Sequence, residues 1–220
     1  MDMNINLLIN RLKKAPYYTK QNLSIMLEKD GNDLNYWIKK LLREKILISL
    51  KKGFYISAYY KDLVNQDPKE SSEYLEYLAN KLRYPSYVSL EYVLAKKNFI
   101  PEAVFTITSV TTKSTRNYSS KFCFFSYRNI KKKLYSGFQL TDFRDKNVRI
   151  ATLAKALFDF LYFRDQKGDK SLKNYLLIES RFNWNILGKK DSEEFKEIIN
   201  FSNSSKMKKI CEILGKEGIL

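Results

Sequence analysis

Two groups of basic residues have the types and spacing needed to bind an anionic partner. The first group lies between positions 20 and 52, where two polar residues accompany six basic ones: Lys20, Asn35, Tyr36, Lys39, Lys40, Arg43, Lys51 and Lys52. The second group lies between positions 113 and 133 and comprises Lys113, Arg116, Lys121, Arg128, Lys131, Lys132 and Lys133. Lysine and arginine bind phosphate oxygens, so both groups point to nucleic acid or another anion.

The charge balance of the chain supports this interpretation. Its 220 residues include 40 Lys and Arg against 24 Asp and Glu, a formal net charge of +16. No acidic residue occurs between Glu102 and Asp142, the stretch that contains the whole second group. Soluble surfaces usually mix both signs of charge, so an acid-free stretch favours an anionic partner. An ordinary solvated basic face remains the alternative.

The composition excludes several kinds of active site. The chain contains no histidine, which excludes Ser-His-Asp and Cys-His nucleophiles and zinc sites that need imidazole. Its two cysteines, Cys123 and Cys211, are too few for a four-cysteine cluster, and we expect both to be free thiols. The sequence has no glycine-rich phosphate loop and no paired metal-ligand spacing. We therefore expect no cofactor, no metal and no catalytic activity.

Carboxylate side chains are candidate catalytic groups that the composition does not exclude. Asp142 and Asp145 fall in an expected loop, and Asp159 falls on an apolar helix four residues after Lys155. At this spacing we expect Asp159 to form a helical ion pair with Lys155. An enzyme of unknown type that uses Asp or Glu remains a third hypothesis.

The first basic group falls on helices and a hairpin within residues 1–61. Apolar spacing and turn residues predict helices over residues 5–14, 20–29 and 33–45, then strands over 46–50 and 54–56 joined by a basic turn at 51–53. Thr19 is the expected N-cap of the second helix. Three helices followed by a hairpin are the plan of a winged helix-turn-helix.

A winged helix-turn-helix places its third helix in the major groove of duplex DNA. Asn35 and Tyr36 lie near the N-terminal end of that helix, where they would meet base edges, and the basic residues that follow would reach phosphates. We expect the lysines of the hairpin turn, and Lys20 at the start of the second helix, to add phosphate contacts. A winged helix that binds protein instead of DNA is the alternative.

The remainder of the chain is expected to form a second domain over residues 74–220. Residues 62–73 combine acidic residues with proline and serine, and we expect a linker there. The pattern then predicts helices over 72–82 and after Ser89, strands over 103–112, 121–127, 134–140 and 148–151, and helices over 153–163, 172–182, 193–201 and 206–214. The expected fold class is therefore α+β: a winged helix-turn-helix, then a small mainly antiparallel sheet, then C-terminal helices.

Four segments of this second domain resemble a known family. In order, they are SYVSLEYVL (86–94), IPEAVFTITSVTTK (100–113), FSYRNIKKKLYSGF (125–138) and RIATLAKALFDFLYF (149–163). They are similar to blocks of the AbiEi-type antitoxins of type IV toxin–antitoxin (abortive infection) systems. The helices expected over 172–214 show no such similarity.

The resemblance implies a specific function. The winged helix would bind inverted repeats in its own promoter and repress transcription. The second domain would counteract a nucleotidyltransferase-like toxin without catalysis and without a stable complex. The alternative function is that of an RNA-binding protein that uses the basic 103–133 surface of the second domain. With no signal peptide and no membrane span in the sequence, we expect a cytoplasmic protein.

Overall fold

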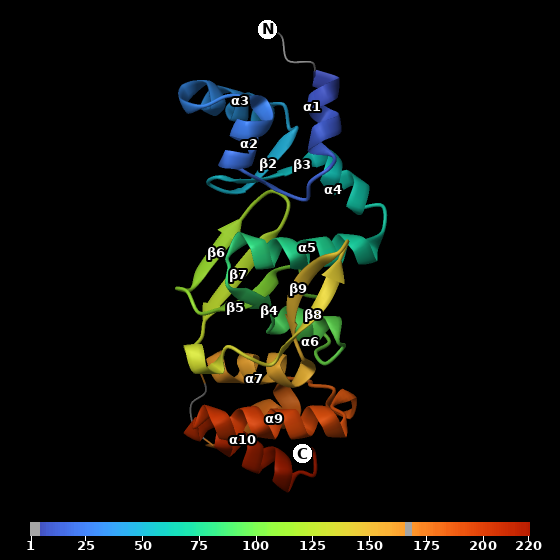
Figure 1. Cartoon of the computed structure of the whole chain (residues 1–220). Helices are drawn as coiled ribbons and strands as arrows, with labels where there is room; N and C mark the ends of the chain where they lie inside the picture. The colour runs from blue at the N-terminus through green and yellow to red at the C-terminus, as the bar shows by residue number, and fades with distance from the viewer. Residues whose placement is uncertain (1–4, 166–168) are drawn as a thin grey trace.

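The computed structural model of the chain describes residues 5–165 and 169–220. Figure 1 shows an elongated molecule, with the N-terminal helices at one end, a large sheet in the middle and the C-terminal helices at the other end. The expected α+β class is confirmed. Among the described residues, no helix combines the length and the apolar character that a membrane crossing requires.

The winged helix-turn-helix is present at the N-terminal end. Its elements are α1 (Ile5–Leu12), β1 (Tyr18–Thr19), α2 (Lys20–Leu27), α3 (Gly31–Arg43), β2 (Leu47–Lys51) and β3 (Phe54–Ser57), with an antiparallel sheet in the order β1-β3-β2. Thr19 caps α2 as expected, because its hydroxyl accepts a hydrogen bond from the backbone N–H of Asn22 at 3.1 Å. The inner face of α3 packs into the core through three buried side chains, those of Leu34, Ile38 and Leu41.

The segment that we expected to be a linker, 62–73, is mostly helical. It contains the end of α4 (Ala58–Val64), a short turn and the first part of α5 (Pro68–Leu82). Asp67 caps α5 by accepting a hydrogen bond from the N–H of Lys69 at 2.8 Å, and Pro68 takes the first turn, where its missing N–H costs nothing. The residues that looked like a linker are therefore the start signal of a helix, and α5 begins earlier than the expected Ser72.

The central sheet has six strands in the order β6-β7-β5-β4-β9-β8. The strands are β4 (Ser86–Val88), β5 (Ile107–Thr111), β6 (Arg116–Ser119), β7 (Phe124–Asn129), β8 (Phe138–Phe143) and β9 (Lys146–Ala151). The β4–β9 and β5–β7 pairs are parallel, and the other three pairs are antiparallel. Four of the six strands were expected, and the sheet is both larger and more mixed than predicted. The third expected strand begins at Phe138 because residues 132–134 form a 3-10 turn.

Helices cover the two faces of this sheet. The helix α5 lies on one face, and α6 (Glu91–Lys96) and α7 (Leu153–Phe163) lie on the other (Figure 1). Beyond α7 lie α8 (Asp169–Asn174), a π-helical turn (Tyr175–Glu179), a 3-10 turn (Trp184–Ile186), α9 (Lys189–Ser202) and α10 (Ser205–Lys216). The helices α9 and α10 both pack against α7, so the C-terminal helices extend the core of the second domain.

The β2–β3 hairpin, which we call the wing, is packed between the two parts of the molecule. Tyr55 of β3 belongs to the core of the winged helix, whereas Phe54 and Ile56 belong to the core of the second domain. Successive side chains of a strand point to opposite faces, so both faces of β3 are buried. The wing is a layer that the two domains share.

Candidate nucleic-acid interface

The outer face of α3 carries the residues that we expected to contact DNA. The side chains of Asn35, Tyr36, Lys39 and Arg43 are exposed, and that of Lys40 is half-buried. Lys40 Nζ lies 4.7 Å from the centroid of the Trp37 ring, a cation–π contact that holds this ammonium along the helix. Trp37 itself is partly buried and packs against the winged-helix core.

The charges on this face are not neutralised within the molecule. Among the described residues, Lys39, Lys40 and Arg43 form no ion pair with a carboxylate. Lys20 is exposed at the first position of α2, and its backbone N–H donates to the carbonyl oxygen of Gly53 in the wing at 3.2 Å. The structure therefore places basic side chains without carboxylate partners at the N-terminus of α2 and on the C-terminal half of α3.

The two lysines of the wing have different environments. Lys52 is exposed at the tip of the hairpin. The ammonium of Lys51 donates a hydrogen bond to the carbonyl oxygen of Leu82, at the end of α5, and lies 5.4 Å from the centroid of the Tyr118 ring. Burial lowers the pKa of Lys51, and the nearby cationic side chain of Arg83 lowers it further. Lys51 thus attaches the wing to the second domain, and only Lys52 remains in solvent at the tip.

The second basic group is exposed but does not form one compact patch. All seven side chains lie in solvent: Lys113, Arg116, Lys121, Arg128, Lys131, Lys132 and Lys133. Lys121 lies in the turn before β7, and the run 131–133 follows its other end. A six-residue strand is about 20 Å long at roughly 3.3 Å per residue. The group therefore follows the outer edge of the sheet instead of surrounding one point.

Two exposed aromatic residues near this group were missed by sequence reasoning. Phe105 is 86% exposed and Phe124 is 55% exposed, although both stand in apolar sequence. Phe125 and Tyr127 of β7 are buried, so the alternation of the strand sends Phe124 to the opposite face. That alternation is the signal that could have found Phe124, but the apolar run 122–125 concealed it.

Two hollows adjoin the basic residues. A groove of about 970 Å³ lies between the winged helix and the turn before β7, with Lys45, Lys61 and Lys121 in its lining. Lys61 is paired there with Asp62 at 3.2 Å. A smaller pocket of about 390 Å³ lies between the start of α6 and the exposed face of β7, and its lining includes Phe105 and Arg128.

The expected ion pair between Lys155 and Asp159 is confirmed, but it is fully buried. Lys155 Nζ lies 2.7 Å from Asp159 Oδ1 and also donates to the carbonyl oxygen of Leu134 at 2.9 Å, while both side chains are 0% exposed. The hydroxyls of Tyr87 and Ser89 donate to Asp159 Oδ2 at 2.9 and 2.8 Å. Burial raises the pKa of Asp159, and its pairing with Lys155 opposes that rise. No substrate can reach this carboxylate from solvent.

This buried network joins three of the four segments singled out in the sequence. Tyr87 and Ser89 belong to the first segment, Leu134 to the third, and Lys155 and Asp159 to the fourth. These segments thus contribute side chains to the packing of the second domain.

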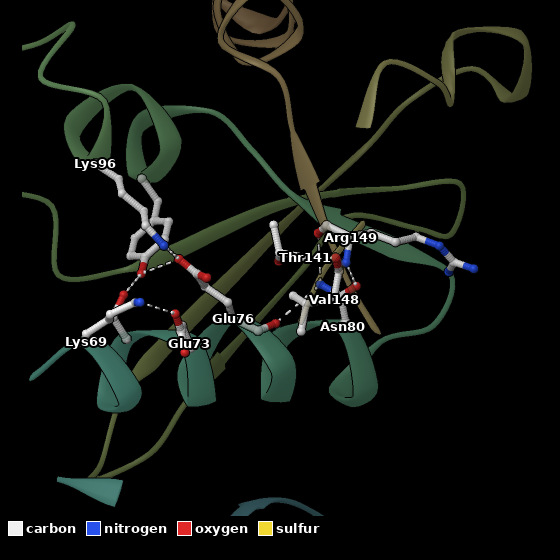
Figure 2. Close-up of polar contacts among 10 residues, drawn as sticks. Lys69, Glu73, Glu76, Asn80, Lys96, Thr141, Val148 and Arg149 are labelled. Carbon is white, nitrogen blue, oxygen red and sulfur yellow. Dashed lines mark hydrogen bonds and ion pairs between the residues drawn. The ribbon is translucent and has the colours of Figure 1, made fainter. Parts of the chain in front are cut away.

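A second buried carboxylate lies on α5. Glu76 is 1% exposed, forms an ion pair with Lys96 of α6 and accepts a hydrogen bond from the hydroxyl of Tyr92 at 3.0 Å (Figure 2). One turn further along α5, the amide of Asn80 bonds to both the N–H and the carbonyl oxygen of Arg149 on β9, while the Arg149 guanidinium points away from these contacts (Figure 2). Figure 2 thus shows α5 bound by polar contacts to α6 on one side and β9 on the other.

The remaining carboxylates named in the sequence stand apart from these networks. Asp142 and Asp145 are exposed, at the end of β8 and in the turn that follows it. Within 5–165 and 169–220, no group of three or more Cys, Asp or Glu is arranged to hold a metal ion. Both cysteines are free, with Cys123 buried and Cys211 half-buried.

No protein-family model matches the sequence, and no curated protein matches it.

Proposed function

We propose that the chain is a DNA-binding transcriptional autorepressor and the antitoxin of a type IV toxin–antitoxin system, which counteracts a nucleotidyltransferase-like toxin without catalysis. One observation carries the DNA-binding part: the exposed face of α3 presents polar and basic side chains without carboxylate partners among the described residues. Helix α3 has the place of a recognition helix, whose outer face meets base edges and phosphates.

In this proposal each part of the surface has a distinct task. Asn35 and Tyr36 contact base edges, because they lie in the N-terminal half of α3. Lys39, Lys40 and Arg43 bind the flanking phosphates, and Lys20 and Lys52 extend those contacts on both sides. Lys51 has no contact with DNA and fixes the wing to the second domain. An operator with inverted repeats would hold two copies of the chain.

The antitoxin part of the proposal is supported by the four resembling segments. Asp159, the carboxylate in the most apolar of these segments, is shut off from solvent and bound on both oxygens by protein groups. This burial is consistent with neutralisation of the toxin without catalysis. The partner is a nucleotidyltransferase-like toxin with which the chain forms no stable complex.

Duplex binding tests the first part of the proposal. Fluorescence anisotropy would measure the affinity for the promoter DNA of the chain's own gene, over a range of salt concentrations, for the wild type and for a triple variant, Lys39→Gln, Lys40→Gln and Arg43→Gln. Each lost phosphate contact lowers the salt slope by about 1, so we expect a slope smaller by about 3 and weaker binding.

A matched variant controls for net charge. Lys189, Lys190 and Lys208 are exposed on α9 and α10, and their replacement by Gln removes the same charge at the far end of the molecule. We expect little change in slope from that variant. Equal losses in the two triple variants would show that α3 does not bind the DNA. For the antitoxin part, co-expression with a nucleotidyltransferase encoded by a neighbouring gene should restore growth.

A further inference from the structure

Part of the central sheet has a face that no helix covers. Tyr127 of β7 points toward α5, where its hydroxyl donates to the carbonyl oxygen of Ala79 at 2.8 Å. The neighbouring residues Phe124, Ser126 and Arg128 therefore point to the opposite face. On that face α6 packs against β5 and α7 packs against β9, while Phe124 and Arg128 stay exposed. We call the exposed surface of β6, β7 and the adjacent loop 103–106 the open face.

Two exposed phenylalanines, Phe105 and Phe124, belong to the open face. The strands β5 and β7 are parallel, and Ile107 is paired with Phe125. This register places Thr106 beside Phe124. Phe105 precedes β5, and it lines the pocket of about 390 Å³ together with Ser126 and Arg128 of the open face. The exposed fractions of Phe105 and Phe124, 86% and 55%, are large for residues that usually pack inside proteins. Two exposed rings on this part of the sheet indicate a surface that meets a partner.

Polar groups lie next to the rings on the same face. The hydroxyl of Ser126 donates to Asn117 Oδ1 on β6 at 2.9 Å, which leaves the amide nitrogen of Asn117 to donate outward. The guanidinium of Arg128 has no ion pair among the described residues and lines the pocket of about 390 Å³. Glu91, at the start of α6, also lines that pocket and is a hydrogen-bond acceptor. Donors and an acceptor thus surround the space beside the rings.

Basic residues occupy both ends of the open face. Lys121 precedes β7 and Lys131–Lys133 follow it, so positive charge lies at either end of a strand about 20 Å long. A protein partner that binds through apolar contacts would use only the exposed rings and not the basic residues. A chain with a phosphate on every unit would need the rings and the charges together, since bases stack on aromatic side chains while lysines bind the backbone.

We propose that the open face binds single-stranded nucleic acid. Bases stack on Phe105 and Phe124, Asn117 and Arg128 donate hydrogen bonds to base edges, and the lysines at the two ends of β7 bind phosphates. Aromatic residues on an open sheet bind two or three bases in this way in other proteins. The residues of this site all belong to the second domain and none is proposed to bind duplex DNA, although Lys121 at one end shares a groove with Leu42 of α3.

Binding of homopolymers to the full chain tests the proposal. Labelled oligouridine and oligothymidine of about 12 nucleotides would be titrated with the wild type and with the variant Phe105→Leu/Phe124→Leu. Both side chains are exposed, so leucine keeps the apolar character and removes only the stacking surface. We expect the loss of each ring to weaken binding at least about fivefold, so that the two losses multiply in the double variant. The tighter of the two oligonucleotides identifies RNA or DNA as the ligand.

Two control variants make the result specific. Phe201 on α9 is 60% exposed, and Phe201→Leu repeats the substitution at a distant site, where we expect unchanged binding. The variant Lys39→Gln/Arg43→Gln should lose duplex binding and keep single-strand binding. The proposal is overturned if neither oligonucleotide binds, if the double phenylalanine variant binds like the wild type, or if the α3 variant loses both kinds of binding.

Discussion

Removal of the charge of Lys155 should make the stability of the fold depend strongly on pH. In the wild type, this ammonium lies 2.7 Å from Asp159 Oδ1, and both side chains are completely buried. The variant Lys155→Met keeps most of the apolar stem and leaves the carboxyl of Asp159 without its counter-charge. A buried unpaired carboxylate takes up a proton instead of remaining ionised, so folding of the variant is coupled to protonation of Asp159.

The size of the stability loss follows from the pKa of an aspartate carboxyl in the unfolded chain. An unfolded aspartate has a pKa of about 3.9, and each pH unit above it costs about 1.4 kcal/mol to protonate the group. At pH 7 the variant therefore loses up to about 4 kcal/mol through Asp159, and near pH 4 this loss vanishes. The lost hydrogen bond to the carbonyl oxygen of Leu134 adds about 1 kcal/mol at every pH.

The sign follows from the direction of the pKa shift. Burial already raises the pKa of Asp159 in the wild type, where Lys155 opposes the rise. Without that lysine, the pKa in the folded state rises further above the value in the unfolded state. Stability is then fully present below about pH 3.9 and is lost as the pH rises toward the pKa of the folded state. The stability of the variant should fall more steeply with pH than that of the wild type.

The free energy of unfolding can be measured between pH 4 and pH 7 by urea unfolding, followed by tryptophan fluorescence. It is roughly 5–15 kcal/mol for a typical domain. A second variant, Lys155→Met/Asp159→Asn, removes the titrating group and keeps an acceptor for the hydroxyls of Tyr87 and Ser89. We expect it to be more stable than Lys155→Met at pH 7 and similar to it at pH 4. A loss from Lys155→Met that is the same at both pH values would refute the reasoning.

Further predictions concern the glycines and the cysteines. Gly137 and Gly53 have φ angles of +73° and +78°, but only at Gly137 would a Cβ meet an atom, Lys155 Cγ at 2.9 Å. In thermal unfolding, Gly53→Ala should cost about 1 kcal/mol and Gly137→Ala about 1–3 kcal/mol more, and equal losses would contradict the contact. Burial raises the pKa of Cys123 to about 11, and Cys211 is less buried. Iodoacetamide at pH 8 should therefore alkylate Cys211 first, as mass spectrometry can check, and faster labelling of Cys123 would show that its site is open.

The parts of the fold that were predicted correctly depend on local signals. The cap at Thr19, the apolar stripe of α3 and the helix Leu153–Phe163 each follow from residues within a few positions of one another. The strand β6 was missed because its sequence, RNYS, is polar and lies at the edge of the sheet, where no alternation is required. The short strand β4 gave no periodic signal either.

The surface was harder to predict because its side chains depend on distant partners. The inward turn of Lys51 requires the carbonyl oxygen of Leu82, 31 residues away in the chain. The exposure of Phe124 depends on which helices cover the sheet, and no local pattern contains that information. The sequence showed which basic residues make up the two groups. It could not show which of these side chains contact other protein groups, as Lys51 does, and which lie in solvent.

The shared position of the wing determines how this protein can be cut. A chain shortened to residues 1–61 would expose Phe54, Ile56 and Tyr60 to water, since these side chains belong to the core of the second domain. The complementary fragment would lose the same side chains from its interior and keep a cavity in their place. Neither half would keep an intact core when expressed alone. Genetic dissection of the two proposed activities would therefore have to rely on surface substitutions, because a truncation would damage both halves at once.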